Sequence, residues 1–324
     1  MTLGTLESGL IISNLGRHYL VETPQGKRLI CHSRGKKALA VVGDRVRWQI
    51  SQDEGTIETI EPRRNLFYRQ DDVRTKSFAA NLDQVLILVA AEPEFSAMQL
   101  TRALIAAEAA GIAPLIGLNK QDLSVPFKQA WDRLLPYQNM GYKVLPLSLK
   151  PRTATSGDQT PSSQSLRENL SGNATLVLGP SGAGKSTLIN AMIPTALAQT
   201  SEISKALNTG KHTTTSTTWY WLDSERKTAL IDSPGFQEFG LQHIDAANLA
   251  AFMPDLKVHL GNCKFYNCSH LHEPGCSVSA NVQKDVATGQ ASTDSESNGL
   301  PRPINAHRYK LYRELHAELS QTRY

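Results

Sequence analysis

About the first seventy residues carry short apolar runs separated by turn residues. Turn-forming Gly, Pro, Asn and Asp recur at residues 14–16, 23–26, 43–44 and 53–55. Short strands spaced about eight to twelve residues apart are typical of a small β-barrel or sandwich. We expect five or six strands here, which include residues 10–12, 19–21, 28–31, 40–42 and 45–50.

From about residue 83 the pattern changes to continuous apolar runs that alternate with helical periodicity. Such runs are typical of strands buried on both faces of a parallel sheet. The alternation of strand and helix predicts a doubly wound α/β sheet. Its expected elements are strands at residues 85–90, 114–118, 143–147, 175–178 and 228–231, and helices at residues 98–110, 127–136 and 187–192.

Two polar stretches interrupt this pattern, at residues 151–165 and 290–303. Both are rich in Ser, Thr and Pro and hold too few apolar residues to bury a core, so we expect mobile connections there. A final helix is predicted over residues 305–320, because leucines recur there at every fourth position.

The chain has 324 residues, 40 % hydrophobic and 20 % charged, which is near the average of globular proteins. This length favours two or three domains. The sequence has no apolar run of ~18 residues and no basic segment ahead of an apolar N-terminal one. We therefore expect a protein of the cytoplasm, without a signal peptide or a membrane span.

The net charge of +4 comes from the N-terminal quarter: residues 1–76 hold 13 Lys and Arg against nine Asp and Glu. A basic, strand-rich module of this size fits an OB-like barrel, a common nucleic-acid platform. A solvated basic face is the alternative interpretation. In the expected final helix, Arg308, Lys310 and Arg313 are also compatible with RNA contact.

The sharpest chemical signal is a phosphate-binding loop that matches G-x-x-x-x-G-K-[ST] between a predicted strand and a predicted helix. Its backbone N–H groups would form an anion nest at a helix N-terminus. Lys185 would reach the β- and γ-phosphates, and Ser186 would bind Mg²⁺. The predicted contacts to a nucleoside triphosphate are Gly179, Pro180, Ser181, Gly182, Ala183, Gly184, Lys185, Ser186 and Thr187.

Polar residues at the ends of two predicted strands indicate guanine as the base. The Asp122 carboxylate could accept from N1–H and the exocyclic amine together, a donor pair that adenine lacks. The Asn119 amide would meet the N7/O6 edge, and the stem of Lys120 would cover the ring. A backbone amide at the end of the next strand could meet O6. The predicted contacts are Asn119, Lys120, Gln121, Asp122, Ser148 and Leu149.

Two further segments would complete a GTPase. Asp232 follows a predicted strand and would hold Mg²⁺ through water, and the Gly235 N–H would meet the γ-phosphate. Residues 210–215 read Gly-Lys-His-Thr-Thr-Thr. A hydroxyl of Thr213 or Thr214 could complete the Mg²⁺ shell and act as a switch that senses the γ-phosphate. Ordinary strand or turn threonines are the alternative interpretation.

Three of the four cysteines, Cys263, Cys268 and Cys276, fall within fourteen residues, together with His270 and His272. An odd number of clustered cysteines argues for a metal rather than disulfides. Three thiolates and one imidazole form the closed four-ligand set of a structural Zn²⁺ site. We predict one zinc ion per chain, with a histidine of this cluster as the fourth ligand.

The order of these motifs is unusual, because the guanine motif at residues 119–122 precedes the phosphate loop by about sixty residues. Joining the natural termini and opening the chain elsewhere would preserve the sheet. The strand-rich N-terminus, the motif order, the Gly-Lys-His-Thr-Thr-Thr stretch, Asp-Ser-Pro-Gly at residues 232–235 and C-x4-C-x-H-x5-C together carry a resemblance. The chain resembles the circularly permuted bacterial GTPases called ribosome small subunit-dependent GTPase A.

This resemblance covers nearly the whole chain and implies a GTPase that binds the small ribosomal subunit and its rRNA. It implies action in late maturation of that subunit, with hydrolysis that is slow until the subunit stimulates it. It favours His270 over His272 as the zinc ligand. We also expect a monomer with no membrane partner. The implied domains are an OB-fold-like RNA-binding domain at residues 1–73, a circularly permuted GTPase domain at 74–238, and a zinc-binding and C-terminal helical domain at 239–324.

The position that Ras-like GTPases fill with a water-positioning Gln holds Phe236, which cannot orient water. His212, beside the switch threonines, is the catalytic candidate, and a solvated loop histidine is the alternative. A monovalent cation held by an Asn of the phosphate loop has less support, because the corresponding residue is Gly182.

Two other classes of function stay open at this point. A P-loop ATPase or small-molecule kinase with appended modules would not need the guanine motif, so the ratio of GTP to ATP binding discriminates it. An RNA-binding scaffold with a vestigial nucleotide site is opposed by the intact Lys185, Ser186 and Asp232, and measurable turnover would exclude it.

Overall fold

The computed structural model falls into two compact units by its internal contacts, residues 1–135 with 142–240 and residues 136–141 with 241–324. Each unit is described by itself below. The structure describes residues 6–16, 18–34, 40–51, 54–70, 75–149, 161–193, 217–233, 240–283 and 302–321.

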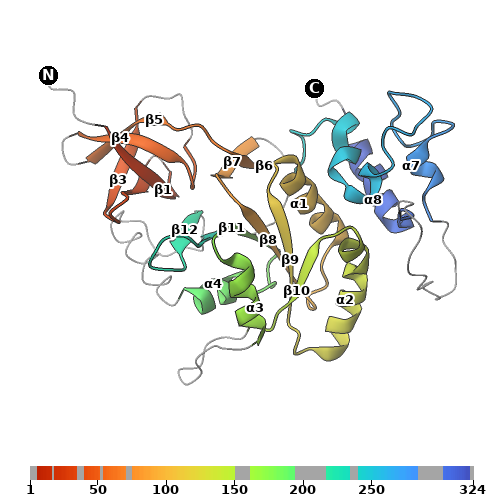
Figure 1. Cartoon of the computed structure of the whole chain (residues 1–324), viewed down its shortest axis with the longest axis horizontal. Helices are drawn as coiled ribbons and strands as arrows, with labels where there is room; N and C mark the ends of the chain where they lie inside the picture. Colours follow the sequence, from red (N-terminus) through yellow and green to blue (C-terminus); the bar gives the residue numbers. More distant parts are fainter. Residues whose placement is uncertain are drawn as a thin grey trace. The chain divides into compact units, whose positions relative to one another are not determined.

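The first unit begins with a closed five-stranded barrel, drawn in red and orange in Figure 1. The strand order is β1-β2-β3-β5-β4, and β4 pairs back with β1 to close the barrel. Its core includes Ile11, Val21, Cys31, Val46 and Trp48. The predicted OB-like barrel is therefore present. Its strands are β1 (Glu7–Leu15), β2 (His18–Glu22), β3 (Arg28–Ser33), β4 (Arg45–Ser51) and β5 (Glu54–Ile60).

Two local predictions in the barrel are wrong. Residues 40–42 hold a single bridge, from Val42 to Ala79, rather than a strand. Of the expected turn at residues 53–55, Glu54 and Gly55 belong instead to β5, and residue 53 lies outside the described part of the chain. Gly55 is needed inside that strand because a Cβ there would lie 2.4 Å from the Cys31 Sγ.

The rest of the first unit is an α/β sheet with the order β10-β9-β8-β11-β13-β12. The first five of these strands are parallel, and β12 is antiparallel to β13. A short hairpin, β6 (Leu66–Gln70) with β7 (Thr75–Ala80), precedes the sheet. The strands are β8 (Gln84–Ala90), β9 (Ala113–Asn119), β10 (Lys143–Pro146), β11 (Ala174–Leu178), β12 (Thr218–Trp221) and β13 (Ala229–Asp232).

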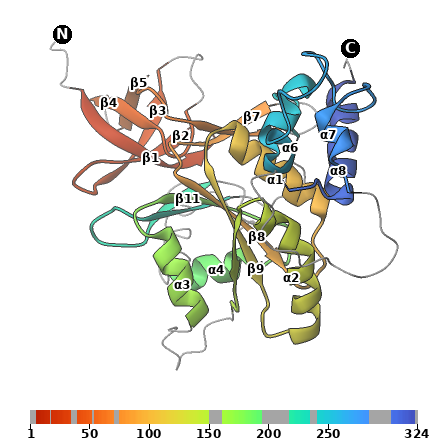
Figure 2. The ribbon, with the colours of Figure 1, turned by 45° about the vertical axis from the view of Figure 1, so that its right-hand side comes forward.

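Helices cover both faces of this sheet, as the strand–helix alternation predicts (Figure 2). Leu86 and Leu88 of β8 share a buried core with α3 and α4. Because side chains alternate along a strand, Val85 and Ile87 face the opposite layer, where α1 packs against β8 and β9. The helices are α1 (Ala97–Ala109), α2 (Ser124–Asn139), α3 (Pro161–Leu170) and α4 (Lys185–Met192).

The polar stretch at residues 151–165 is only partly described, and its end is helical. Residues 161–165 form the start of α3, whose Leu166 and Leu170 are fully buried. The expected mobile connection is therefore wrong for these residues, while residues 151–160 lie outside the described part of the chain. The sequence pattern misses α3 because its first five residues are all polar or proline.

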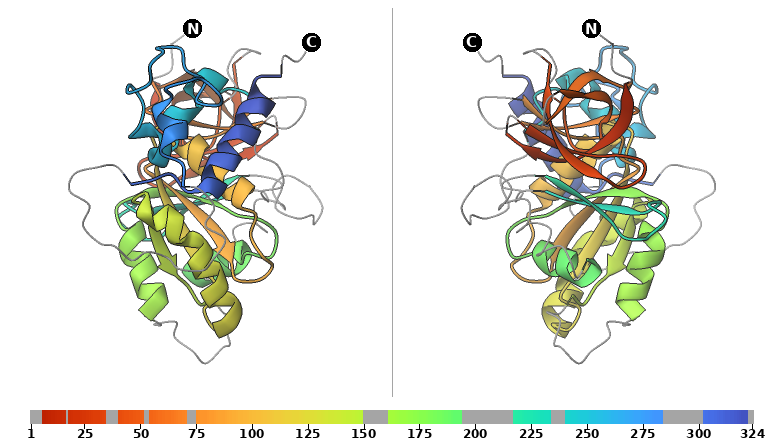
Figure 3. Two further views of the ribbon diagram at one scale, coloured as in Figure 1. Left: turned by 90° about the vertical axis from the view of Figure 1, so that its right-hand side faces the viewer. Right: turned by 90° about the vertical axis from the view of Figure 1, so that its left-hand side faces the viewer.

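The second unit is built from short helices and one longer C-terminal helix, the latter drawn in dark blue in Figure 3. In α8, Arg308 is 3 % exposed and its guanidinium pairs with the Asp255 carboxylate at 3.0 Å. Arg308 is therefore a structural cation, so the compatibility with RNA contact that the sequence indicates does not extend to it. The helices are η1 (Ala246–Phe252), α6 (Pro254–Lys257), α7 (Ser277–Ala280) and α8 (Ala306–Leu319).

The second polar stretch, residues 290–303, is described only at its end. Arg302 donates to the backbone and side-chain oxygens of Asn139, at 3.4 and 3.2 Å. For residues 290–301, which lie outside the described part of the chain, the expected mobile connection stays a prediction. Within the described residues, no helix is long and apolar enough to cross a membrane.

Candidate nucleotide site and metal centre

The phosphate loop joins β11 to α4 by a turn that requires glycine. Gly182 and Gly184 adopt left-handed φ angles of 80° and 104°, which residues with a Cβ rarely adopt. At Gly179, a Cβ would lie 2.3 Å from the Leu88 carbonyl oxygen, so the loop passes against β8 without room for a side chain. The loop leads directly into the N-terminus of α4, where N–H groups and the helix dipole favour an anion.

Lys185 is the first residue of α4, and its Nζ donates to the carbonyl oxygens of Gly179 and Pro180, at 2.5 and 3.3 Å. Burial lowers the pKa of Lys185, while the charge of Asp232 acts in the opposite direction. This cation is held by carbonyls of the loop itself, which phosphate oxygens could replace. Ser186, next in the chain, is exposed.

Asn119 connects the guanine motif to both neighbouring loops. It ends β9, is 2 % exposed, and its Nδ2 donates to the Ala183 carbonyl at 2.9 Å. Its Oδ1 accepts from the Leu149 N–H, also at 2.9 Å. A Cβ on Gly184 would lie 2.4 Å from this Nδ2, so the glycine makes room for the contact. The motif, the phosphate loop and the end of the next strand are therefore one hydrogen-bonded structure.

The remaining guanine-motif residues lie at the rim of the same site. Asp122 is exposed and accepts from the Ser148 hydroxyl at 3.4 Å. Lys120 has a left-handed φ of 69°, and the Gln121 N–H donates to the Leu147 carbonyl at 2.9 Å. These contacts bring together the two strand ends that the sequence places in one site. One of the backbone amides that could meet O6, the Leu149 N–H, donates to Asn119 here.

Asp232 ends β13 in the position expected for a Mg²⁺ carboxylate. Burial raises its pKa, while a hydrogen bond from the Ser233 backbone and the charge of Lys185 act in the opposite direction. The Ser233 hydroxyl donates to the Val177 carbonyl at 2.7 Å, which fixes the end of β13 against β11. The charges of Lys185 and Asp232 therefore act on each other's pKa, so the two side chains lie close enough to bind a phosphate and its magnesium ion together.

Four of the predicted residues lie outside the described part of the chain: His212, Thr213, Thr214 and Gly235. Phe236 also lies outside it. The catalytic assignment of His212 and the switch contacts stay predictions.

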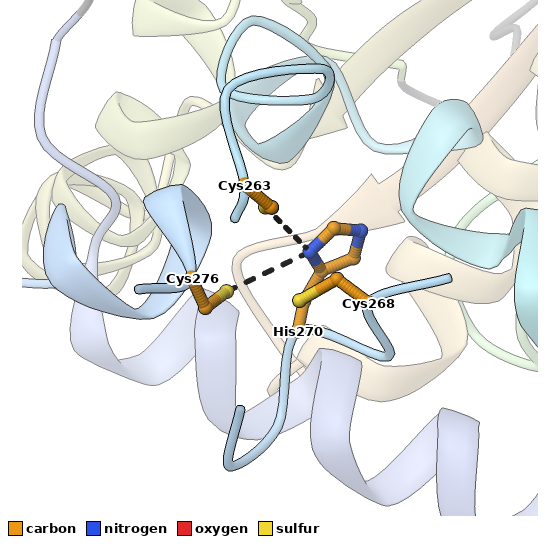
Figure 4. Close-up of side chains that lie close together, drawn as sticks. All are labelled: Cys263, Cys268, His270 and Cys276. Atoms are coloured by element: carbon orange, nitrogen blue, oxygen red, sulfur yellow. Dashed lines mark hydrogen bonds between the residues drawn. The ribbon is translucent and has the colours of Figure 1, made fainter. Parts of the chain in front are cut away.

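The second unit brings four soft ligands together. Cys263, Cys268, His270 and Cys276 offer ligand atoms that all lie within 4.8 Å of one another. Figure 4 shows their side chains pointing to one place, with His270 Nδ1 at 3.5 Å from the Cys263 Sγ and 3.6 Å from the Cys276 Sγ. His272 does not join this group. The four residues could hold one metal ion that prefers sulfur and nitrogen ligands.

Backbone N–H groups around the cluster favour thiolates. The Ser277 N–H donates to the Cys263 Sγ at 3.4 Å, and the Ser279 N–H donates to the Cys276 Sγ at 3.3 Å. Burial would raise the pKa of Cys276, but hydrogen bonds from Ser279, Cys268 and Val278 together bring the pKa below its usual value. At Cys268, burial instead raises the pKa to about 12. A metal ion binds the thiolate form, so this environment fits one.

Sequence reasoning missed Glu273, which holds the ligand loop in shape. Its carboxylate accepts from the backbone N–H of Ser269 at 2.8 Å and from the Ser269 hydroxyl at 2.6 Å. Burial would raise the pKa of Glu273, but these and neighbouring backbone hydrogen bonds lower it well below its usual range. The signal available in the sequence was one carboxylate within a cluster of soft ligands. From α8, Tyr309 and Tyr312 donate to the carbonyls of His270 and Ser269, both at 2.7 Å.

The sheet order and the site define the class of this protein. The phosphate loop and Asp232, the expected Mg²⁺ carboxylate, follow the adjacent parallel strands β11 and β13, and the guanine motif ends β9, which β8 separates from β11. The guanine motif comes first along the chain. This is a P-loop GTPase with a circularly permuted sheet. A sequence model of the family described as RsgA GTPase matches residues 60–242. The chain belongs to the RsgA GTPase family and is a GTP-hydrolysing enzyme.

Relatives match almost the whole chain. The Small ribosomal subunit biogenesis GTPase RsgA of Variovorax paradoxus (strain S110) is 64 % identical over 319 residues, 98 % of this chain and 94 % of the relative. The protein of the same name from Paraburkholderia xenovorans (strain LB400) is 46 % identical over 324 residues, 98 % of this chain and 95 % of the relative. The resemblance seen in the sequence is therefore confirmed.

Solved structures share the fold. The crystal structure of YloQ, a circularly permuted GTPase, aligns with a TM-score of 0.67 and 27 % identity, over 99 % of this chain and 98 % of that one. YjeQ from Thermotoga maritima aligns with a TM-score of 0.70 and 24 % identity, over 98 % of this chain and all of the other. The predicted fold class is confirmed, and the kinase and scaffold alternatives lose their support.

Proposed function

We propose that this chain is a GTPase that binds the small ribosomal subunit, acts in its late maturation and is stimulated by it. The relatives are named for small ribosomal subunit biogenesis and align over nearly their whole length. The observation that carries the proposal is the Asn119 bridge, which joins the guanine motif to an intact phosphate loop. A vestigial site would have no reason to keep this arrangement.

We assign the nucleotide contacts as the sequence predicts them. Asp122 reads the guanine N1–H and amine, and the stem of Lys120 and the loop at Gln121 and Ser148 surround the base. Asn119 Nδ2 carries two hydrogens, so one can stay on Ala183 while the other meets N7. The Leu149 N–H exchanges Asn119 for O6 when the nucleotide enters.

The phosphates lie on the loop of residues 179–187. Lys185 leaves its two carbonyl partners for the β- and γ-oxygens, and Ser186 with Asp232 holds Mg²⁺. Thr213 or Thr214 and Gly235 contact the γ-phosphate side, and His212 positions the hydrolytic water.

We propose zinc for the cluster in the second unit. Three sulfurs and one imidazole nitrogen are the donor set of a closed tetrahedral zinc site, which leaves no position open for catalysis. The metal would therefore stabilise the fold of the unit.

We propose three domains with separate roles, at residues 1–73, 74–238 and 239–324. The barrel and the zinc domain grip rRNA, with an affinity that falls steeply with salt. The protein works as a cytoplasmic monomer, where small subunits mature, and needs no membrane partner.

The decisive experiment measures GTP hydrolysis with and without purified small ribosomal subunits, with ATP and large subunits as controls. We expect strong stimulation that is confined to GTP and the small subunit. Unstimulated turnover, or equal use of ATP, would contradict the proposed partner.

A further inference from the structure

Strand β12, which follows the expected switch at residues 210–215 along the chain, pairs with a strand of the N-terminal barrel. Ser13 of β1 pairs with Thr218 of β12, and Thr218 pairs in turn with Asp232 of β13. The three neighbouring strands β1, β12 and β13 therefore form one continuous sheet. Ser13, Thr218 and Asp232, the expected Mg²⁺ ligand, lie side by side on them. The Ser13 hydroxyl also faces the Thr217 carbonyl at 3.5 Å, and both residues are buried.

A second contact lies at the other end of β12. Trp221 Nε1 donates to the Glu22 Oε1 at 2.7 Å, across 199 residues of chain. Glu22 is 4 % exposed, and its Oε2 accepts from the Arg28 Nε at 2.8 Å. Arg226, in the turn between β12 and β13, lies 3.7 Å from Glu22 and donates to the Pro24 carbonyl at 3.1 Å.

A buried carboxylate is costly to desolvate, so Glu22 depends on the partners that surround it. Charge-assisted hydrogen bonds fix both the distance and the direction of a contact. Glu22 gathers one partner from the barrel and two from the hairpin. Its side chain therefore joins the two parts, in addition to the backbone pairing of Ser13 with Thr218.

This junction can be reached from outside. A cavity of about 440 Å³ lies beside it and is lined by residues of the barrel and the hairpin, including Glu22, Trp221 and Arg226. Arg45 and Arg47 of β4 line the same cavity and are exposed. Arg47 pairs with Glu61, which lines the same cavity, at 2.9 Å. An RNA phosphate could bind Arg45 and compete with Glu61 for Arg47, so a bound RNA would touch the junction directly.

We propose that Glu22 is a positioning residue for the stimulated, not the basal, hydrolysis of GTP: it couples occupation of the barrel to the placement of Asp232 through the β12–β13 hairpin. The partner in this inference rests on the proposed function. Coupling is reciprocal, so a partner that shifts the barrel against the hairpin changes the nucleotide site, and the nucleotide changes the barrel.

The test uses full-length Glu22→Gln and Trp221→Phe proteins. Trp221 and Arg28 donate to different oxygens of Glu22. The change Glu22→Gln places an NH2 group, which is a donor, against one of these two donors, so that contact is lost. Trp221→Phe removes one N–H donor and leaves Glu22 paired with Arg28, so it retains the fold if Glu22→Gln does not. The matched control is Glu225→Gln, because Glu225 lies on the same hairpin, is exposed, and pairs only with Lys227 among the contacts described.

We expect both variants to keep KM for GTP and basal kcat within about two-fold and to lose about five-fold or more of the stimulation by small subunits, while Glu225→Gln behaves as wild type. Sedimentation with subunits checks that binding persists. Wild-type stimulation in both variants would overturn the inference. A wild-type protein without stimulation would instead overturn the proposed function.

If the wild-type protein is not stimulated, a second experiment with nucleotides alone tests the inference. Tryptophan emission is compared between the GDP-bound and GTP-analogue-bound proteins, in wild type, Glu22→Gln and Glu225→Gln, all of which keep Trp221 and its ring neighbour Trp219. We expect a nucleotide-dependent difference that Glu22→Gln reduces and Glu225→Gln retains. Equal emission in the two nucleotide states, or a difference that Glu22→Gln leaves unchanged, would overturn the inference without reference to any partner.

Discussion

The side-chain amide of Asn119 donates to the Ala183 carbonyl at 2.9 Å, across 64 residues of chain. The same side chain accepts from the Leu149 N–H. One buried residue thus fixes the base-reading motif relative to the phosphate loop, and the distance between the two is what a nucleotide must span.

Asn119→Ala should weaken GTP binding more than the loss of one base contact explains. The Ala183 carbonyl and the Leu149 N–H both lose a partner, at about 1–3 kcal/mol each for buried groups. We expect about 10- to 100-fold weaker binding of a fluorescent GTP analogue. Asn248→Ala, which makes the same change at an exposed asparagine outside the predicted nucleotide contacts, is the control. Wild-type affinity in Asn119→Ala would show that the bridge does not organise the site.

Asp122→Asn should change the base that the site accepts. Xanthine carries a carbonyl where guanine carries the exocyclic amine, and an Asn amide can donate to that carbonyl. We expect GTP affinity to fall about 100-fold or more while xanthosine triphosphate binds better than GTP. Competition between the two nucleotides measures this. If the variant still prefers GTP, Asp122 does not read the base.

The sequence was most informative where the local pattern and the tertiary environment agree. The parallel strands were predictable because they are buried on both faces, and the phosphate loop because its glycines meet backbone constraints that no other residue satisfies. Gly55 was predicted to lie in a turn because glycine is common in turns. In the structure it lies inside β5, where the absence of a side chain makes room for Cys31.

Other features depend on partners that are distant in sequence. From the sequence, Arg308 resembles a surface cation of an amphipathic helix. In the structure it is buried and pairs with Asp255, which lies 53 residues earlier in the chain. The Asn119 bridge and the Glu22–Trp221 contact are invisible for the same reason. Glu273 could have been suspected from its place within the cysteine cluster, but its hydrogen-bonded neighbours could not.

Removal of the metal should unfold the second unit and leave the nucleotide site intact. Binding free energy of a structural zinc ion is folding free energy, because the unfolded chain has no preformed site. We expect Cys276→Ser to lose the single equivalent of zinc and one melting transition, while GTP binding persists. The control is His272→Ala, because His272 does not join the ligand cluster. Zinc retained in Cys276→Ser, or lost in His272→Ala, would contradict the assigned ligand set.

Asp232→Asn should lower the rate of GTP hydrolysis and raise the melting temperature of the nucleotide-free protein. Burial raises the pKa of Asp232 in the folded protein, so the folded state binds more protons than the unfolded state between the usual and the raised pKa. The stability that this group contributes is present below the usual pKa and is lost as pH rises through the raised one. We therefore expect nucleotide-free Asp232→Asn to melt above wild type at neutral pH, with the difference vanishing in acid, while Mg²⁺-dependent hydrolysis falls about 10- to 100-fold.

The control for this prediction has the opposite sign. Hydrogen bonds from the backbone of Lys227 and from Thr228 lower the pKa of Asp223, which lies in the turn of the same hairpin. Asp223→Asn should therefore melt below wild type at neutral pH and approach it as pH falls through the lowered pKa, with basal hydrolysis unchanged. Melting curves across this pH range, with hydrolysis measured alongside, separate the two carboxylates. Destabilisation by Asp232→Asn at neutral pH would mean that the ionised carboxylate supports the empty site rather than being held there for the nucleotide.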